Sequence, residues 1–145
     1  MKNSFINATI DSPKVKKRLT LKKTKHIINE NEIRELLSKE LPEINCELEK
    51  LSNTNNVYKT MECFVGFTKQ LINTGKINTV KQCFNLAEKM LEEGNNTVKN
   101  AIENVYVYSL GTFVELSVST AYQLKEFFNG SLKKEYIRQV MASGI

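Results

Sequence analysis

Apolar residues recur at spacings of three and four along most of this chain of 145 residues. Such spacing is typical of helices that bury one face. The pattern starts near Asn29, which precedes Glu32 by the three residues of a helix-capping box. It is interrupted at Pro42, the polar run 52–56, Gly75, Gly94 and Gly130. The sequence therefore predicts an all-α fold, a compact bundle of six or seven helices.

The clearest helical stretch runs from residue 76 to residue 110. Its tetrapeptide Asn-Thr-Val-Lys occurs at 78–81 and again at 96–99, and each Asn could cap the helix that it begins. Gly94 lies between the two copies, in a connection so short that the helices on either side must pack antiparallel. Gly94 could also adopt a positive φ there. We therefore expect a helical hairpin centred on this glycine.

Beyond residue 105 the pattern supports two structures. Residues 105–108 and 113–118 are rich in β-branched and aromatic residues, so they could form a hairpin across Gly111. The cap and the 3.6-residue period favour a helix over 97–110, whereas 112–119 stays open between helix and extended chain. After Gly130 we expect Ser131 to cap a last helix. Its apolar residues are Leu132, Tyr136, Ile137, Val140 and Met141.

Several helix junctions follow one another in a recognisable order. A Leu-Pro-Glu-Ile junction at 41–44 precedes a long helix, and the run AEKMLEEG at 87–94 leads into VKNAIENV at 98–105. From Leu37 to about Leu110 the chain thereby resembles a family of small bacterial all-helical domains of unknown function. The resemblance implies an all-α fold and no particular activity.

Charge is distributed unevenly. The first 26 residues carry eight Lys or Arg and one acid, whereas the remaining 119 carry thirteen and fifteen. Residues 1–28 lack sustained periodicity, and Pro13 breaks any early helix. We therefore expect residues 1–28 to form a flexible basic N-terminal arm, followed by one helical domain over 29–145. The alternation at 18–22 could instead form an edge strand or add a strand to a partner's sheet.

The basic run of the arm is a candidate contact for anions or for a partner. Its cations could neutralise several phosphates with steep dependence on salt, or they could meet anionic lipid. No aromatic side chain interleaves them and only one is an arginine, so any nucleic-acid binding would be weakly specific. These candidate contacts are Lys14, Lys16, Lys17, Arg18, Lys22, Lys23 and Lys25.

Catalytic machinery is scarce in the composition. His26 is the only histidine and lies in the arm, Asp11 is the only aspartate, and the glycines are dispersed rather than clustered in a phosphate loop. The three cysteines are not spaced as zinc ligands and lie within apolar helical patterns, where we expect buried thiols. We therefore predict a protein that is not an enzyme and that holds no metal or cofactor.

Two tyrosines are candidates for contact with a partner. Tyr106 and Tyr108 stand two positions apart, so on one helix they cannot both join the same buried stripe. At least one of them should lie at the edge of the core or outside it. Tyrosine is favoured at protein interfaces because its ring is apolar and its hydroxyl is polar.

These observations favour a non-catalytic protein-interaction module of the kind found among small bacterial immunity proteins, adaptors and accessory subunits. The alternative is a nucleic-acid-binding accessory protein that uses the lysine-rich arm. No apolar run approaches the roughly 20 residues needed to cross a bilayer, and the first residues lack a signal-peptide core. We therefore expect a cytoplasmic location and another protein as the partner.

Overall fold

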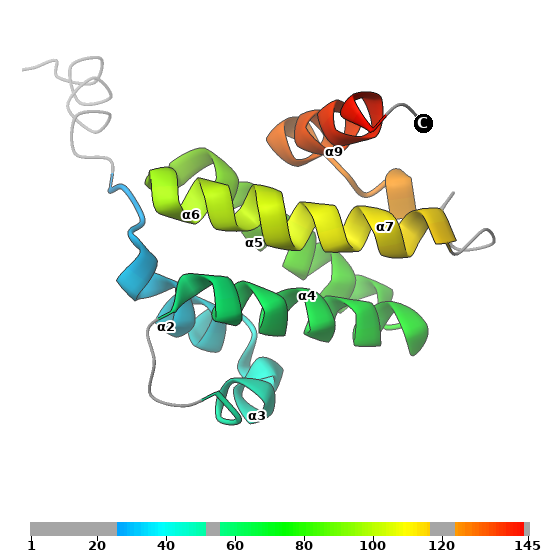
Figure 1. Ribbon diagram of the computed structural model, residues 1–145. Coiled ribbons are helices and arrows are strands. Elements are labelled where there is room, and N and C mark those ends of the chain that lie inside the picture. Colours follow the sequence, from blue (N-terminus) through cyan, green and yellow to red (C-terminus); the bar gives the residue numbers. More distant parts are fainter. Residues whose placement is uncertain (1–25, 52–55, 117–123, 144–145) are drawn as a thin grey trace, which may run out of the picture.

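A computed structural model describes residues 26–51, 56–116 and 124–143 of the chain (Figure 1). In this part of the chain every named element is helical, so the predicted all-α fold is confirmed. The elements are η1 (Glu30–Glu32), α2 (Ile33–Glu40), η2 (Pro42–Ile44), α3 (Asn45–Leu48), α4 (Val57–Asn73), α5 (Ile77–Glu93), α6 (Asn96–Ala101), η3 (Ile102–Val107), α7 (Tyr108–Leu116) and α9 (Gly130–Ala142).

Helices α4 and α5 pack against each other in the middle of the bundle. The turn between them is closed by two hydrogen bonds, from Gly75 N to Ile72 O (3.1 Å) and from Lys76 N to Leu71 O (2.9 Å). These bonds form a Schellman motif, which needs a residue with positive φ after the helix cap. Gly75 supplies it with a φ of 73°. The glycine stop predicted here is confirmed.

One nearly continuous helix runs from Asn96 to Leu116 through α6, η3 and α7 (Figure 1). Its middle section, η3, is π-helical. The helix predicted for 97–110 is therefore confirmed, and the alternative hairpin is wrong for residues 105–116. Of the segment that stayed open, 112–116 is helical and 117–119 lies outside the described residues.

The caps at the hairpin differ from the prediction by one residue or more. Asn95, not Asn96, caps α6, since its Oδ1 accepts from Val98 N at 2.9 Å. Asn78 lies within α5, which begins after Lys76 without a side-chain cap. Gly94 has an extended backbone, with a φ of −77° rather than a positive one. A Cβ on Gly94 would lie 2.5 Å from both Met90 O and Val98 Cγ1, so the close approach of two helices requires a glycine here.

The segment before η1 is attached to this corner. Ile28 N donates to Glu93 O (2.9 Å), and Asn95 N donates to Ile28 O (2.8 Å). The Ile28 side chain is only 5% exposed and belongs to the core. We predicted that the arm extends to residue 28, but burial and backbone pairing place Ile28 in the domain.

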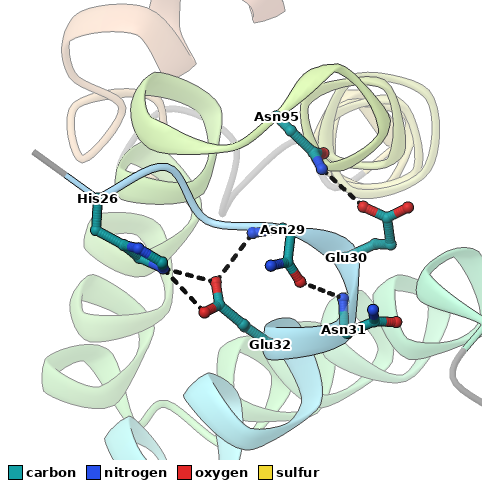
Figure 2. A network of polar contacts seen from close by, with 6 residues as sticks. All are labelled: His26, Asn29, Glu30, Asn31, Glu32 and Asn95. Atoms are coloured by element: carbon teal, nitrogen blue, oxygen red, sulfur yellow. Dashed lines mark hydrogen bonds and ion pairs between the residues drawn. The ribbon is translucent and has the colours of Figure 1, made fainter.

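A polar network holds the same segment in place (Figure 2). His26 Nε2 lies 2.9 Å from the Glu32 carboxylate, which also accepts from Asn29 N at 3.0 Å. Asn29 and Glu32 thereby form the capping box that their spacing predicted. Across the network, Asn95 Nδ2 donates to Glu30 Oε1 at 2.7 Å.

Helix α9 lies on α5 and on the α6–η3–α7 helix (Figure 1). Its N-terminus is capped from another helix, because the Glu88 carboxylate accepts from Ser131 N (3.0 Å) and Leu132 N (2.8 Å). We expected Ser131 to be the cap, but it lies in the first turn of α9. Gly130 has a φ of 50°, a left-handed conformation that favours glycine, and it lies against the Glu88 carboxylate, which a Cβ here would displace.

Candidate functional site

Helices α7 and α9 line an apolar groove with a volume of about 300 Å³. Each helix contributes residues spaced i, i+3, i+4 and i+7, which form one straight stripe on a helix surface. The α7 stripe is Tyr108, Gly111, Thr112 and Glu115, and the α9 stripe is Tyr136, Gln139, Val140 and Ser143, with Leu116 at one end. We call this hollow the α7–α9 groove.

The floor of the groove depends on one glycine. A Cβ on Gly111 would lie 3.3 Å from two ring atoms of Tyr136, tighter than an ordinary van der Waals contact. The missing side chain therefore lets the Tyr136 ring approach α7. That ring is buried and packs against Phe128, with centroids 5.1 Å apart. The contact between Gly111 and the Tyr136 ring thus joins the two walls of the groove.

Large apolar side chains are exposed on the two helices that form the groove. Six such side chains are exposed in the described part of the chain, and four of them lie on α7 or α9. Tyr108 (63% exposed) and Leu116 (79% exposed) line the groove. Ile137 and Met141 are exposed on α9 but are not among the residues that line it.

A polar contact joins the two walls of the groove. The Tyr136 hydroxyl donates to the Glu115 carboxylate, and Lys125 Nζ lies 3.2 Å from Glu115 Oε2. The hydrogen bond from Tyr136 lowers the pKa of Glu115, with a further contribution from Lys125. Burial, with the adjacent carboxylate, raises the pKa of Tyr136. At neutral pH the pair is therefore an ionised Glu115 and a protonated tyrosine.

The outer edge of α9 holds a second polar cluster. Arg138 Nε donates to Glu135 Oε1 at 2.9 Å, and this pairing lowers the pKa of Glu135. Gln139 Nε2 donates to Glu135 Oε2 (2.8 Å) and to Glu103 O on η3 (2.7 Å). Because these polar groups satisfy one another, what the groove presents to solvent is chiefly apolar.

Two lysines on α9 differ from the cations nearby. Lys125 and Arg138 are each engaged by a carboxylate. Lys133 and Lys134 are exposed, and no residue in the described ranges pairs with them. They stand one turn before Ile137, which is also exposed. None of these three residues lines the α7–α9 groove.

The sequence of this bundle matches one family model, described as "Domain of unknown function (DUF7674)", over residues 34–142. The chain belongs to this family. The match agrees with the resemblance of residues 37–110 to a helical domain of unknown function and extends it through Ala142, so α7 and α9 both lie within the family domain. No curated protein and no solved structure matches the chain.

The structure separates the two tyrosines that we predicted to face a partner. Tyr108 lines the α7–α9 groove and is exposed. Tyr106 is 0% exposed, so its assignment to a partner-facing surface is wrong. Its hydroxyl lies 2.9 Å from Thr68 Oγ1, and its ring stacks on Phe64 with centroids 4.4 Å apart.

The π-helical turn explains this error. A π turn inserts one residue into an α-helix, which shifts the buried face by about 100°. The predicted stripe continued from Ile102 to Val105, but in the structure it continues to Tyr106 and Val107. Val105 is only partly buried. No local pattern in the sequence predicted this π-helical turn.

Sequence reasoning did not single out the other residues that line the groove, and it also missed two exposed residues of α9. We assigned Ile137 and Met141 to the apolar pattern of the last helix, yet both are exposed. A signal was present, because the apolar residues of this helix cover more than the single stripe that one packing partner can bury. The seven basic residues predicted as contacts, between 14 and 25, lie outside the described residues.

The described residues offer little reactive chemistry. They contain no group of three or more His, Cys, Asp or Glu side chains that could hold a metal ion. Burial raises the pKa of the Cys63 thiol and raises that of Cys83 to about 11, so both are protonated at neutral pH. Cys46 is exposed, contrary to our expectation that every cysteine is buried. No helix in these ranges is both long and apolar enough to cross a bilayer.

Proposed function

We propose that this domain is a non-catalytic protein-interaction module that binds its partner through the α7–α9 groove. The observation that carries the proposal is an apolar hollow between α7 and α9 whose lining includes Tyr108 and Leu116, two of the six large apolar side chains that are exposed in the described ranges. Single exposed apolar residues are common on protein surfaces, but an apolar hollow lined by exposed apolar side chains is typical of interaction sites. Tyr108 adds an amphipathic ring, which is favoured at such interfaces.

The titratable groups of the groove support a binding role. A general acid or base works best with a pKa near neutrality. The pKa of Glu115 is shifted down and that of Tyr136 is shifted up, so both move away from neutrality. Their hydrogen bond fixes the spacing of α7 and α9 instead. Binding through a preformed groove needs such rigidity, because less ordering is then lost on association.

The cytoplasmic location and the bacterial setting expected from the sequence are parts of the same proposal. Within that setting, the partner is another protein, as for immunity proteins, adaptors and accessory subunits. The alternative, nucleic-acid binding by residues 14–25, rests on their seven Lys or Arg. Measuring the affinity of the full chain and of a chain that starts at His26 for duplex DNA, at 50 and 200 mM salt, tests this alternative. If residues 14–25 bind nucleic acid, the shortened chain should lose that affinity.

The proposal can be tested by photo-crosslinking in cells. A photoreactive amino acid would replace Tyr108 on the groove and, as a matched control, Tyr58, an exposed tyrosine on α4. We expect a discrete protein adduct from position 108 and none from position 58. Adding Leu116→Glu should abolish the adduct, since it places a charge on the apolar lining of the groove. Equal adducts from both positions, or none from position 108, would contradict the proposal.

A further inference from the structure

We propose that the outer face of α9 docks on the surface of an anionic lipid bilayer. The proposal concerns a different surface from the α7–α9 groove and goes beyond the proposed function. In the docked state the exposed apolar side chains of α9 enter the boundary between headgroups and acyl chains, and its lysines contact lipid phosphates. The outer face comprises the exposed charged and large apolar residues of this helix, Lys133, Lys134, Ile137, Arg138 and Met141.

The order of these residues around the helix carries the proposal. Successive residues of an α-helix are about 100° apart, so the five side chains project within an arc of about 140°. Ile137 and Met141 occupy the middle of this arc. Lys133 lies on one side of them, and Lys134 and Arg138 lie on the other. A helix that lies in a bilayer interface combines the same groups, because the long side chains of lysine and arginine reach the phosphates while apolar side chains go deeper.

The apolar pair is exposed and the charge around it is positive. Ile137 is 46% exposed and Met141 is 73% exposed. The two lysines of the face have no carboxylate partner in the described ranges. The only acidic residue of α9, Glu135, is buried and is engaged by Arg138. The helix therefore presents apolar side chains and cations to its surroundings, and this combination complements negatively charged lipid.

The shape of the outer face favours a bilayer over a protein partner. Helix α9 lies on the outside of the bundle, against α5 and the α6–η3–α7 helix (Figure 1). Its outer face is therefore convex, and neither Ile137 nor Met141 lines the α7–α9 groove. A protein partner would have to supply an apolar pocket for these side chains. A bilayer needs no such pocket, because its headgroups and acyl chains rearrange around a helix.

The start of the described chain adds a second set of cations near this face. Ile28 N donates to Glu93 O at 2.9 Å. Ser131 Oγ donates to the carboxylate of the preceding residue of α5, Glu92, at 3.2 Å. The described chain therefore begins near the N-terminus of α9. The residues before it include seven Lys or Arg between 14 and 25, a length that can span roughly 40 Å. A bilayer is broad enough to meet both sets of cations, and stable membrane binding takes two such signals.

Nucleic acid, another polyanion, fits this face less well. Its phosphates would contact Lys133 and Lys134 but would leave Ile137 and Met141 in water. A lipid surface contacts all four, because its charged headgroups cover an apolar layer. The apolar pair between the cations thus distinguishes lipid from nucleic acid.

The sequence contains no tryptophan, which allows a direct test. Met141→Trp places a single fluorophore in the middle of the outer face, and Tyr58→Trp, at an exposed position of α4, is the matched control. Each full-length variant would be mixed with vesicles of phosphatidylcholine, with or without phosphatidylglycerol. With the anionic vesicles alone, we expect the emission of position 141 to shift to shorter wavelength and to be quenched by lipids brominated on their acyl chains. The emission of position 58 should stay unchanged.

Three further changes, each added to the Met141→Trp variant, measure what the face contributes. Lys133→Gln/Lys134→Gln should weaken vesicle binding by about 10- to 30-fold. Ile137→Glu should remove the shift, because it places a negative charge between the cations. The matched control, Lys59→Gln/Lys76→Gln, removes two exposed lysines of α4 and the α4–α5 turn. At physiological salt it should change the affinity by less than about 2-fold. Thermal unfolding of each variant checks that the fold is kept.

Each outcome decides the proposal. A shift at position 141 that requires anionic lipid and the two α9 lysines supports it. The proposal is wrong if the protein does not bind the vesicles. It is also wrong if the protein binds while position 141 stays in water, since residues 14–25 then act alone. An equal shift at position 58 would overturn it as well. An equal shift at position 141 with duplex DNA or polyglutamate in place of vesicles would assign the face to a soluble polyanion instead.

Discussion

The hydroxyl of Tyr106 lies 2.9 Å from Oγ1 of Thr68 in the interior of the bundle, where both residues are buried. Thr68 Oγ1 also donates to Phe64 O at 2.9 Å, so its proton is committed to the backbone and it accepts the proton of Tyr106. Burial raises the pKa of Tyr106 well above its usual value, and the tyrosine therefore stays neutral. This contact joins α4 to the π-helical turn η3.

Replacing Thr68 should destabilise the bundle through Tyr106. Thr68→Val keeps the volume but leaves the tyrosine hydroxyl without its acceptor, so the free energy of unfolding should fall by about 1–3 kcal/mol. Tyr106→Phe should cost about 1 kcal/mol. The double variant should lose less than the sum, because it has no orphaned hydroxyl. Urea unfolding measures all three.

The matched control for this cycle is Thr74→Val. Thr74 Oγ1 also bonds to a backbone carbonyl, that of Gln70 at 3.0 Å, but it is exposed at the end of α4. Its loss should change the free energy of unfolding by less than about 0.5 kcal/mol. A similar loss for Thr68→Val and Thr74→Val would mean that the buried contact adds nothing.

Acid should weaken the junction of α7 and α9. The pKa of Glu115 in the folded protein is lowered from 4.5 by the Tyr136 hydroxyl. A carboxyl with a lowered folded pKa stabilises the fold above its unfolded pKa, and this contribution is lost as the pH falls through the folded value. Tyr136→Phe should therefore raise the pKa of Glu115, as followed by NMR. It should also lower the unfolding temperature more at pH 7 than at pH 3.

Lys125 supplies the control for that measurement. It also lowers the pKa of Glu115, through a hydrogen bond and through its charge, while the hydrogen bond from Tyr136 is the largest single cause. Lys125→Gln should raise the pKa of Glu115 by a smaller amount than Tyr136→Phe. A larger effect of Lys125→Gln would show that charge, rather than the hydrogen bond, governs this carboxyl.

Two glycines should respond to alanine in opposite directions. At Gly94 the added Cβ would lie 2.5 Å from Met90 O, so Gly94→Ala should lower the free energy of unfolding by about 2 kcal/mol or more. At Gly66, within α4, a Cβ meets no atom within 4 Å. Gly66→Ala should raise the free energy of unfolding by about 0.5–1 kcal/mol, because alanine favours the helix more than glycine does. Chemical denaturation of both variants gives the comparison.

Truncation should locate the start of the folded domain. A chain that begins at His26 keeps Ile28 and its two backbone hydrogen bonds to the α5–α6 corner. It should unfold at the same temperature as the full chain. Removing residues 1–28 takes away a buried isoleucine and should lower the free energy of unfolding by about 2 kcal/mol or more. If the two truncated chains are equally stable, the folded domain begins at residue 29, as the sequence predicted.

Much of the helical framework could be predicted from the sequence because the relevant signals are local. Asn29 and Glu32 form the predicted capping box, Pro42 opens a helical turn, and Gly75 ends α4. Each feature depends on neighbours within about one turn of the chain. The exact position of a cap was harder to predict from the sequence. Asn95 and Asn96 have the same side chain, and only the observed backbone shows which of them caps α6.

The candidate site was decided by tertiary structure. The π insertion buries Tyr106 against α4 and leaves Tyr108 outside, although both are tyrosines of one helix. Helix α9 has more apolar residues than its contacts can cover, and its packing on α5 and α7 determines that Met141 is exposed. The sequence by itself thus determined where helices form, because hydrogen bonding and capping act locally. Only the tertiary structure determined which faces they bury, because burial depends on neighbours distant in sequence.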